Sequence, residues 1–154
     1  MVAYSYIRWS SSIQTKGDSL SRQISKTREF CNSNGWILDE SLQPDKGVSA
    51  FRGKNITEGP LAQFLEKIEN NHIDTPCVLV VEAIDRLTRA HWTEAEKIWR
   101  KIIDEGVTIA SWQTGKIYSP EFMSKSPFNV MMFLIVYLLL FMCNEPLYKY
   151  KLLV

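Results

Sequence analysis

Residues 78–89 read VLVVEAIDRLTR, and this stretch decides the fold that we expect for the chain. It opens with four consecutive apolar residues, as does a strand that is buried on both faces of a parallel sheet. Charged side chains follow at Glu82, Asp85, Arg86 and Arg89. Ligands of open α/β sheets bind outside the carboxyl ends of the strands, so this ending predicts an anion-binding edge. The alternative interpretation is an ordinary helix start, with Asp85 as its cap.

The flanking segments alternate between strand and helix patterns. Strand composition is found at residues 2–9, 36–38, 77–81, 107–112 and 116–118. Helical spacing of apolar residues separates the first four of these strands. This alternation predicts the α/β class, with a mainly parallel central sheet and helices on its two faces.

Residues that favour helix ends mark where these helices should begin. Asp18 or Ser19 would cap the first helix, and Thr57 the second, with Pro60 in its first turn. The third helix should start at the capping box TEAE of residues 93–96.

The C-terminal part of the chain has a different character. Residues 128–143 are almost uninterrupted apolar sequence, which predicts a long apolar helix at the end of the fold. The run falls short of the roughly 20 residues needed to span a bilayer, so a core or dimerisation helix is favoured over a membrane-associated segment. An unpartnered helix of this kind would expose a large apolar patch. We therefore divide the chain into a domain at residues 1–125 and a dimerisation or linker helix at residues 126–154.

Composition limits the classes of function. The chain has 154 residues, enough for one domain, and a formal net charge of +1, so any nucleic-acid contact must come from a local cluster. Cys31, Cys77 and Cys143 lie far apart and form no CxxC pair, which argues against zinc and a disulfide framework. Scattered thiols and an N-terminus without signal-peptide features predict a cytoplasmic protein.

Polar residues follow several of the predicted strands. Arg8 and Ser10 follow the first strand, Asp45 and Ser49 the second, and the acid and arginines of residues 85–89 the third. All should share one edge of a parallel sheet. Arginine offers paired donors to phosphate oxygens, and phosphoryl transfer rests mainly on positioning and charge stabilisation. A serine in such a cluster is suited to attack a phosphodiester, with carboxylates orienting the arginines.

Two other functions fit parts of the pattern. Asp45, Glu82 and Asp85 could serve as the magnesium ligands of a metal-dependent nuclease. The apolar C-terminal helix would also suit a non-catalytic module or remnant that only dimerises.

Four motifs in order carry a resemblance to a known family. They are Tyr6-x-Arg8-x-Ser10, SLSRQ ending at Gln23, DKGVS at residues 45–49 and DRLTR at residues 85–89. Together they resemble the catalytic domain of the serine recombinases, the resolvase/invertase family, over roughly Tyr4 to Tyr118. The segment SAFRGKNITEGPL resembles the large or phage-type members most closely.

The resemblance implies a role for each matching residue. Ser10 would be the nucleophile that forms a 5′-phosphoserine link to DNA, while Arg8, Arg86 and Arg89 would hold the scissile phosphate. The residues that would position these groups are Gln23, Asp45, Ser49 and Asp85. The resemblance also implies catalysis without a cofactor, and a homodimer that pairs into a synaptic tetramer on DNA and exchanges strands by subunit rotation.

The sequence departs from the family pattern in two places. Many members have an arginine where this chain has Glu58, and Arg52 and Lys54 are the candidates to replace it as DNA contacts. The family's DNA-binding domain should follow the last helix, but no helix-turn-helix, zinc-ribbon or basic pattern precedes Val154. We therefore expect a truncated, excised or degenerate recombinase with little site-specific DNA binding of its own, because its near-neutral charge supplies little affinity for phosphate.

Overall fold

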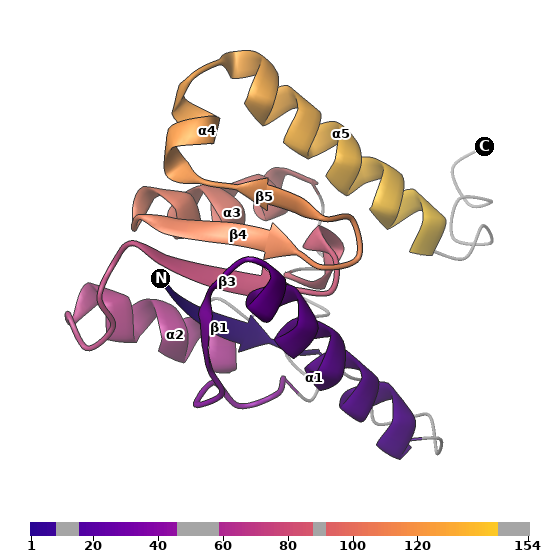
Figure 1. Cartoon of the computed structure of the whole chain (residues 1–154). Helices are drawn as coiled ribbons and strands as arrows, with labels where there is room; N and C mark the ends of the chain where they lie inside the picture. The colour runs from indigo at the N-terminus through magenta and orange to yellow at the C-terminus, as the bar shows by residue number, and fades with distance from the viewer. Residues whose placement is uncertain (9–15, 46–58, 88–91, 145–154) are drawn as a thin grey trace.

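The computed structural model of the protein describes residues 1–8, 16–45, 59–87 and 92–144. A central sheet is flanked by helices (Figure 1), which confirms the predicted α/β class. The elements are, in chain order, β1 (Val2–Tyr6), α1 (Lys16–Ser33), β2 (Ile37–Asp39), α2 (Pro60–Glu69), β3 (Cys77–Val81), the 3₁₀ turn η3 (Ile84–Arg86), α3 (Trp92–Asp104), β4 (Val107–Ser111), β5 (Lys116–Tyr118), α4 (Pro120–Ser124) and α5 (Pro127–Asn144).

The sheet has the strand order β2-β1-β3-β4-β5 and is parallel except for its last pair. In its centre Tyr4 lies opposite Leu79, and Leu79 lies opposite Ile109, in two parallel ladders. β5 pairs antiparallel with β4. All five residues of β3 are buried, as expected of a strand that has a neighbour on each side and helices on each face.

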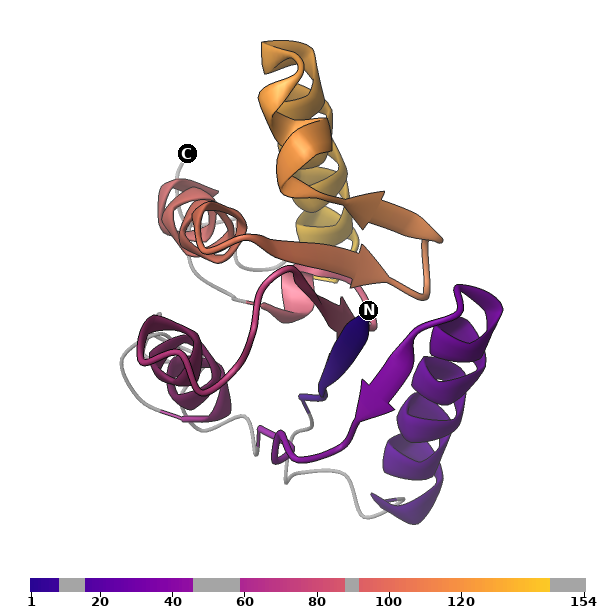
Figure 2. The same ribbon diagram turned by 60° about the vertical axis from the view of Figure 1, so that its left-hand side comes forward.

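Helices on both faces explain why the apolar run of β3 is continuous. α1 lies on one face, and α2 and α3 lie on the other (Figure 2). Because side chains alternate along a strand, Val78 and Val80 pack in a small cluster with Cys31 of α1. Leu79 and Val81 pack in the larger cluster with α2 and α3.

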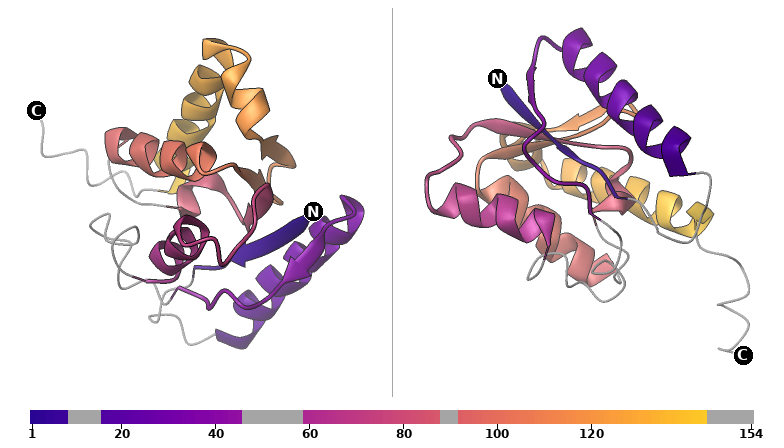
Figure 3. Two further views of the ribbon diagram at one scale, coloured as in Figure 1. Left: turned by 90° about the vertical axis from the view of Figure 1, so that its left-hand side faces the viewer. Right: turned by 90° about the horizontal axis from the view of Figure 1, so that it is seen from below.

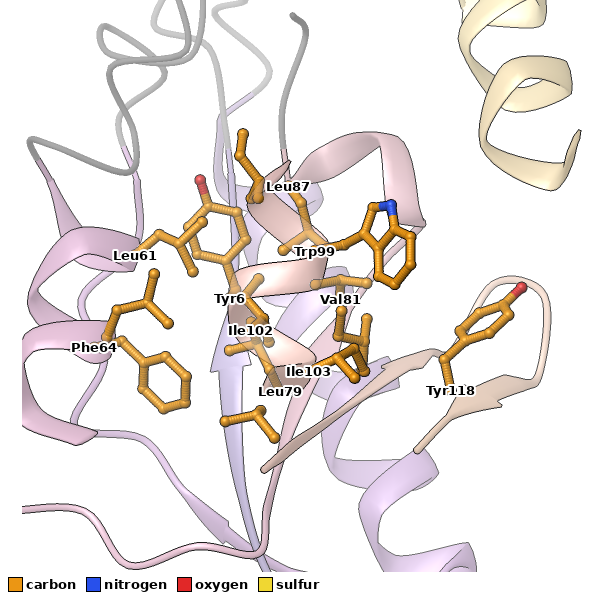
Figure 4. Close-up of a cluster of buried hydrophobic side chains, with 14 of the residues drawn as sticks. Tyr6, Leu61, Phe64, Leu79, Val81, Leu87, Trp99, Ile102, Ile103 and Tyr118 are labelled. Carbon is orange, nitrogen blue, oxygen red and sulfur yellow. The ribbon is translucent and has the colours of Figure 1, made fainter. Parts of the chain in front are cut away.

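The larger cluster includes residues of β1, the strand that leads to the charged residue Arg8. The ring of Tyr4 packs against that of Phe64 at a centroid distance of 5.2 Å. Tyr6 and Leu61 are both buried in the same cluster (Figure 4), and Tyr6 lies opposite Val81 in the parallel ladder of β1 and β3. The core therefore fixes β1, and with it Ile7 and Arg8, which directly follow the strand.

α5 contacts the rest of the domain along one side only. It packs against η3, α3 and α4, on the side of the molecule where β5 forms the sheet edge (Figure 3). Its anchor is the buried Phe133, whose ring lies 4.7 Å from that of Trp99 and 4.8 Å from that of Tyr118. In the described part of the chain, no helix combines the length and the apolarity that crossing a membrane requires.

The predicted helix starts were wrong by a few residues. α1 begins at Lys16, so Asp18 and Ser19 lie within its first turn instead of capping it. The N-cap of α2 is Gly59, not Thr57, because Pro60 occupies the first helical position, where its missing N–H costs nothing.

The capping box was also misplaced, since α3 starts at Trp92 and contains all of residues 93–96. Asp85 lies inside the turn η3, whose N-cap is Ala83, so Asp85 is not the cap of this turn. The short helix α4 was not predicted, although Ser119 caps it by accepting a hydrogen bond from the Phe122 N–H at 3.1 Å.

Candidate active site

The chain beyond β2 returns to the end of β1 and places Asp45 beside Arg8. The two residues form an isolated parallel bridge, and the Asp45 N–H donates to the Ile7 carbonyl at 2.8 Å. The Tyr6 hydroxyl donates to Asp45 Oδ2 at 2.7 Å. Only 6% of Arg8 and 3% of Asp45 is exposed. The buried carboxylate is thus fixed both by its own backbone and by a phenol from the core strand.

The Arg8 side chain extends from the end of β1 towards η3. Its Nη2 donates to the main-chain carbonyl of Asp85 at 3.5 Å, the long limit of a hydrogen bond. Asp85 is itself buried. Arg8 and Asp85, which are 77 residues apart in sequence, are therefore brought together at the carboxyl edge of the sheet, and this contact uses the Asp85 carbonyl oxygen.

Arg86 lies next to Glu82, the first residue after the end of β3. Its Nε forms an ion pair with Glu82 Oε2 at 3.2 Å. The other carboxylate oxygen, Oε1, accepts a hydrogen bond from Arg22 Nη2 of α1, also at 3.2 Å. One carboxylate therefore joins arginines from two elements.

The main chain of Glu82 is held by the end of β4. The Ser111 hydroxyl donates to the Glu82 carbonyl at 2.8 Å, and the Gln113 N–H donates to the same oxygen at 3.1 Å. The Trp112 N–H donates to the Val81 carbonyl at 3.1 Å. Hydrogen bonding between β3 and β4 thus continues past the ends of both strands, and it fixes the main chain at Glu82.

Gln23 lies on α1 next to Arg22, and only 5% of it is exposed. The two neighbours differ sharply, because the Arg22 side chain is 57% exposed. α1 therefore contributes a buried amide and an exposed guanidinium at adjacent positions.

Several predicted site residues lie outside the described part of the structure. They are Ser10, Ser49, Arg52, Lys54 and Arg89. The described members of the predicted set are Arg8, Gln23, Asp45, Asp85 and Arg86.

The proposed magnesium ligands do not form a metal site. Within the described ranges, no three His, Cys, Asp or Glu residues are grouped in a way that could hold a metal ion, and this covers Asp45, Glu82 and Asp85. The Asp45 carboxylate accepts from Tyr6, and that of Glu82 is engaged by two arginines. The prediction of a three-carboxylate site was therefore wrong.

The buried thiols are poor nucleophiles. Burial raises the pKa of Cys77 to about 11, and it also raises the pKa of Cys31. Both are free cysteines with no exposed surface. Because the thiolate is the reactive form, neither supplies covalent chemistry near neutral pH.

Two participants in the site were not assigned from the sequence. Tyr6 was noticed only as part of a motif, although a hydroxyl at the end of an otherwise apolar strand is a sign of a buried partner. Arg22 lies within the SLSRQ motif but was given no role. Its place directly before Gln23 was the available signal.

Comparison with known proteins gives a consistent result. The family model described as "Resolvase, N terminal domain" matches residues 3–138. The uncharacterized protein YbcK of Escherichia coli (strain K12) is 35% identical over 118 residues, which cover 76% of this chain and 23% of that protein. The chain therefore spans about a quarter of the length of this curated relative.

Solved structures show the same fold. A resolvase family site-specific recombinase from Streptococcus pneumoniae has a TM-score of 0.63 and 20% identity, covering 90% of this chain and 87% of that one. The N-terminal catalytic domain of TP901-1 integrase has a TM-score of 0.61 and 19% identity, covering 90% and 93%. The C-terminal catalytic domain of ISC1926 TnpA, an IS607-like serine recombinase, has a TM-score of 0.55 and 24% identity, covering 88% and 78%.

Proposed function

The chain belongs to the resolvase N-terminal domain family of serine recombinases, and from this premise we propose that it cleaves and rejoins DNA in site-specific recombination. The observation that carries the proposal is the convergence of Arg8 and Arg86 at the carboxyl edge of the sheet, each beside a buried or half-buried acid. Guanidinium groups fixed in this way suit a phosphate, which they can bind through paired donors.

Ser10 is the proposed nucleophile. Its oxygen forms a bond to the phosphorus of a DNA phosphodiester, and the bond from phosphorus to the 3′ oxygen breaks. The 3′ oxygen keeps the electron pair and takes up a proton, while the Ser10 hydroxyl loses one. The product is a 5′-phosphoserine link and a free 3′-hydroxyl. The covalent link conserves the bond energy, so the reverse attack rejoins DNA without a nucleotide or metal cofactor.

The arginines would stabilise the charge that develops on the phosphate oxygens. Arg8, Arg86 and Arg89 are assigned this role, which accounts for most of the catalysis in phosphoryl transfer. The contacts of Asp45 and Asp85 support a positioning role, since both residues are buried beside Arg8. Gln23 and Ser49 are assigned to the same task.

The active assembly is proposed to be a homodimer that pairs into a synaptic tetramer on DNA. Residues 126–154 would provide the dimer contact, and residues 1–125 the catalytic domain. Large apolar side chains on α5 are exposed and support this assignment; they are Phe128, Met131, Met132, Ile135, Leu138 and Leu139. Sedimentation should show a dimer for the wild-type chain and a monomer for Leu139→Asp. A Leu139→Asp variant that remains dimeric would contradict this use of α5.

Capture of the covalent intermediate tests the reaction without knowledge of the target site. The chain is incubated with a pool of labelled duplexes of randomised sequence, in the presence of EDTA, and SDS-resistant protein–DNA adducts are measured. The wild type should form an adduct, Ser10→Ala should form none, and the control Ser11→Ala should behave as the wild type. Arg52→Gln and Lys54→Gln, at the assigned DNA contacts, should lower the yield.

The alternatives give different results in the same assay. An adduct that persists in Ser10→Ala would refute the assigned nucleophile. Failure of the wild type to form any adduct would favour a non-catalytic module that associates through α5.

A further inference from the structure

We infer that Glu82 is a positioning residue of this site, because its carboxylate holds Arg86 and Arg22 side by side. The inference rests on the proposed function and deepens it: Glu82 would orient Arg86 for phosphate and fix helix α1 against β3. Glu82 lies outside the four recombinase motifs, and Arg22, although it lies within the SLSRQ motif, is not among the residues to which the resemblance gave a role.

The geometry divides the carboxylate between two partners. Oε2 lies 3.2 Å from Arg86 Nε in an ion pair without hydrogen-bond geometry, and Oε1 accepts a hydrogen bond from Arg22 Nη2 at 3.2 Å. Contact at Nε leaves the two terminal nitrogens of Arg86 for other acceptors. Two guanidinium groups share one carboxylate, so this trio keeps a net charge of +1 and can still attract an anion.

The exposure of the three side chains falls in a gradient. The exposed fraction of the side chain is 12% for Glu82, 29% for Arg86 and 57% for Arg22. An ion pair with an exposed arginine contributes little to the free energy of folding. The arrangement is therefore better suited to setting side-chain direction than to stabilising the domain.

The main chain of Glu82 is fixed by hydrogen bonds. Its carbonyl accepts two hydrogen bonds, from Ser111 and Gln113, which tie it to the end of β4. The guanidinium of Arg22 also lies over the ring of Trp112, with its carbon 5.9 Å from the ring centroid. Arg22 is thus held from two sides, by a carboxylate and by an aromatic face.

Contacts that hold Arg22 in place also hold helix α1, which carries the predicted site residue Gln23. Gln23 is the next residue, and α1 begins six residues after Ser10 in the sequence. Glu82 therefore links the strand that precedes Asp85 and Arg86 to the helix that follows the nucleophile. A small displacement of such groups is enough to cost on the order of 100-fold in rate.

Glu82→Gln tests the inference because it removes the charge and keeps the shape. The rate of adduct formation should fall on the order of 10- to 100-fold, while the midpoint of thermal unfolding should stay nearly unchanged. Glu82→Asp keeps the charge but is one methylene too short to reach both arginines, so it should restore part of the rate. The matched control is Glu96→Gln, which breaks the exposed Glu96–Arg100 ion pair of 2.8 Å on α3 and should leave the rate unchanged.

A second readout does not depend on activity. The Nε–Hε resonance of Arg86, assigned by its loss in Arg86→Lys, should shift in Glu82→Gln and stay in place in Glu96→Gln. Arg22→Gln combined with Glu82→Gln should lower the rate by less than the product of the two single effects, since both act through one contact.

The two proposals fail in different ways. If Ser10→Ala loses the adduct but Glu82→Gln forms it at the wild-type rate, the recombinase function stands and the positioning role is wrong. If the wild type forms no adduct, the proposed function fails, and the Arg86 resonance decides whether Glu82 orients that arginine. A resonance that is the same in Glu82→Gln and the wild type would overturn the inference.

Discussion

The two most apolar segments of the molecule, β3 and α5, differ in how much of their surface is buried. Every residue of β3 is buried, whereas α5 buries Phe133 and exposes residues such as Phe128 and Leu139, each 59% exposed. The strand has a neighbour on each side and helices on both faces, but the helix packs against the domain along one side only. Hydrophobicity alone therefore does not tell whether a segment is core; the number of covered faces does.

The sharpest way to break this comparison is to place the same charge in both segments. Leu79→Asp puts an unpaired carboxylate into the fully buried strand, and should lower the free energy of unfolding by at least about 4 kcal/mol, enough to unfold a marginal domain. Leu139→Asp should change the stability of the monomer by no more than about 0.5 kcal/mol. Urea unfolding followed by circular dichroism at low protein concentration measures both. Equal losses would show that α5 is as much a part of the monomer core as β3.

A second pair of variants sharpens the comparison within α5. Phe133 has no exposed surface and contacts two aromatic rings, so Phe133→Ala should cost about 3–5 kcal/mol. Phe128→Ala, at an exposed position of the same helix, should cost less than about 0.5 kcal/mol. The same urea titration measures both variants. A small effect of Phe133→Ala would mean that α5 is not anchored through this ring.

The smallest expected effect concerns the thiol at the start of β3. Burial raises the pKa of Cys77 from its ordinary value of 9.0 to about 11, so the folded state keeps this proton at pH values where the unfolded chain loses it. Stability should therefore decline slightly as pH rises between these values, because the unfolded state then binds fewer protons. Cys77→Ser should flatten the decline. At pH 8, where the domain is folded, thiol reagents should modify Cys77 only after urea is added. Rapid labelling without urea would show that β3 opens to solvent.

The sequence was most informative where one element alone determines the outcome. The run at residues 78–81 indicated a strand buried on both faces, because no polar side chain interrupts it. The carboxyl ends of parallel strands lie at the same edge of a sheet, so the predicted strands placed four charged residues at that edge: Arg8, Asp45, Asp85 and Arg86. The contacts in the described part of the structure agree with this placement.

Contacts between side chains far apart in sequence were not predictable. The hydrogen bond of Tyr6 to Asp45 joins residues 39 apart, and that of Arg22 to Glu82 joins residues 60 apart. Neither leaves a local pattern. The helix starts failed for a related reason: several cap-forming residues stood near each start, and Pro60 decided the position where Thr57 had been favoured.

The short edge strands have a consequence for how this protein behaves at high concentration. β2 and β5 contain three residues each, and they border a sheet whose inner strands contain five residues each. Such a short edge strand offers few unpaired backbone N–H and C=O groups to a strand of another molecule. This protects the sheet against amyloid-like association. Intermolecular association should therefore proceed through side chains of helix α5 and not through extension of the sheet.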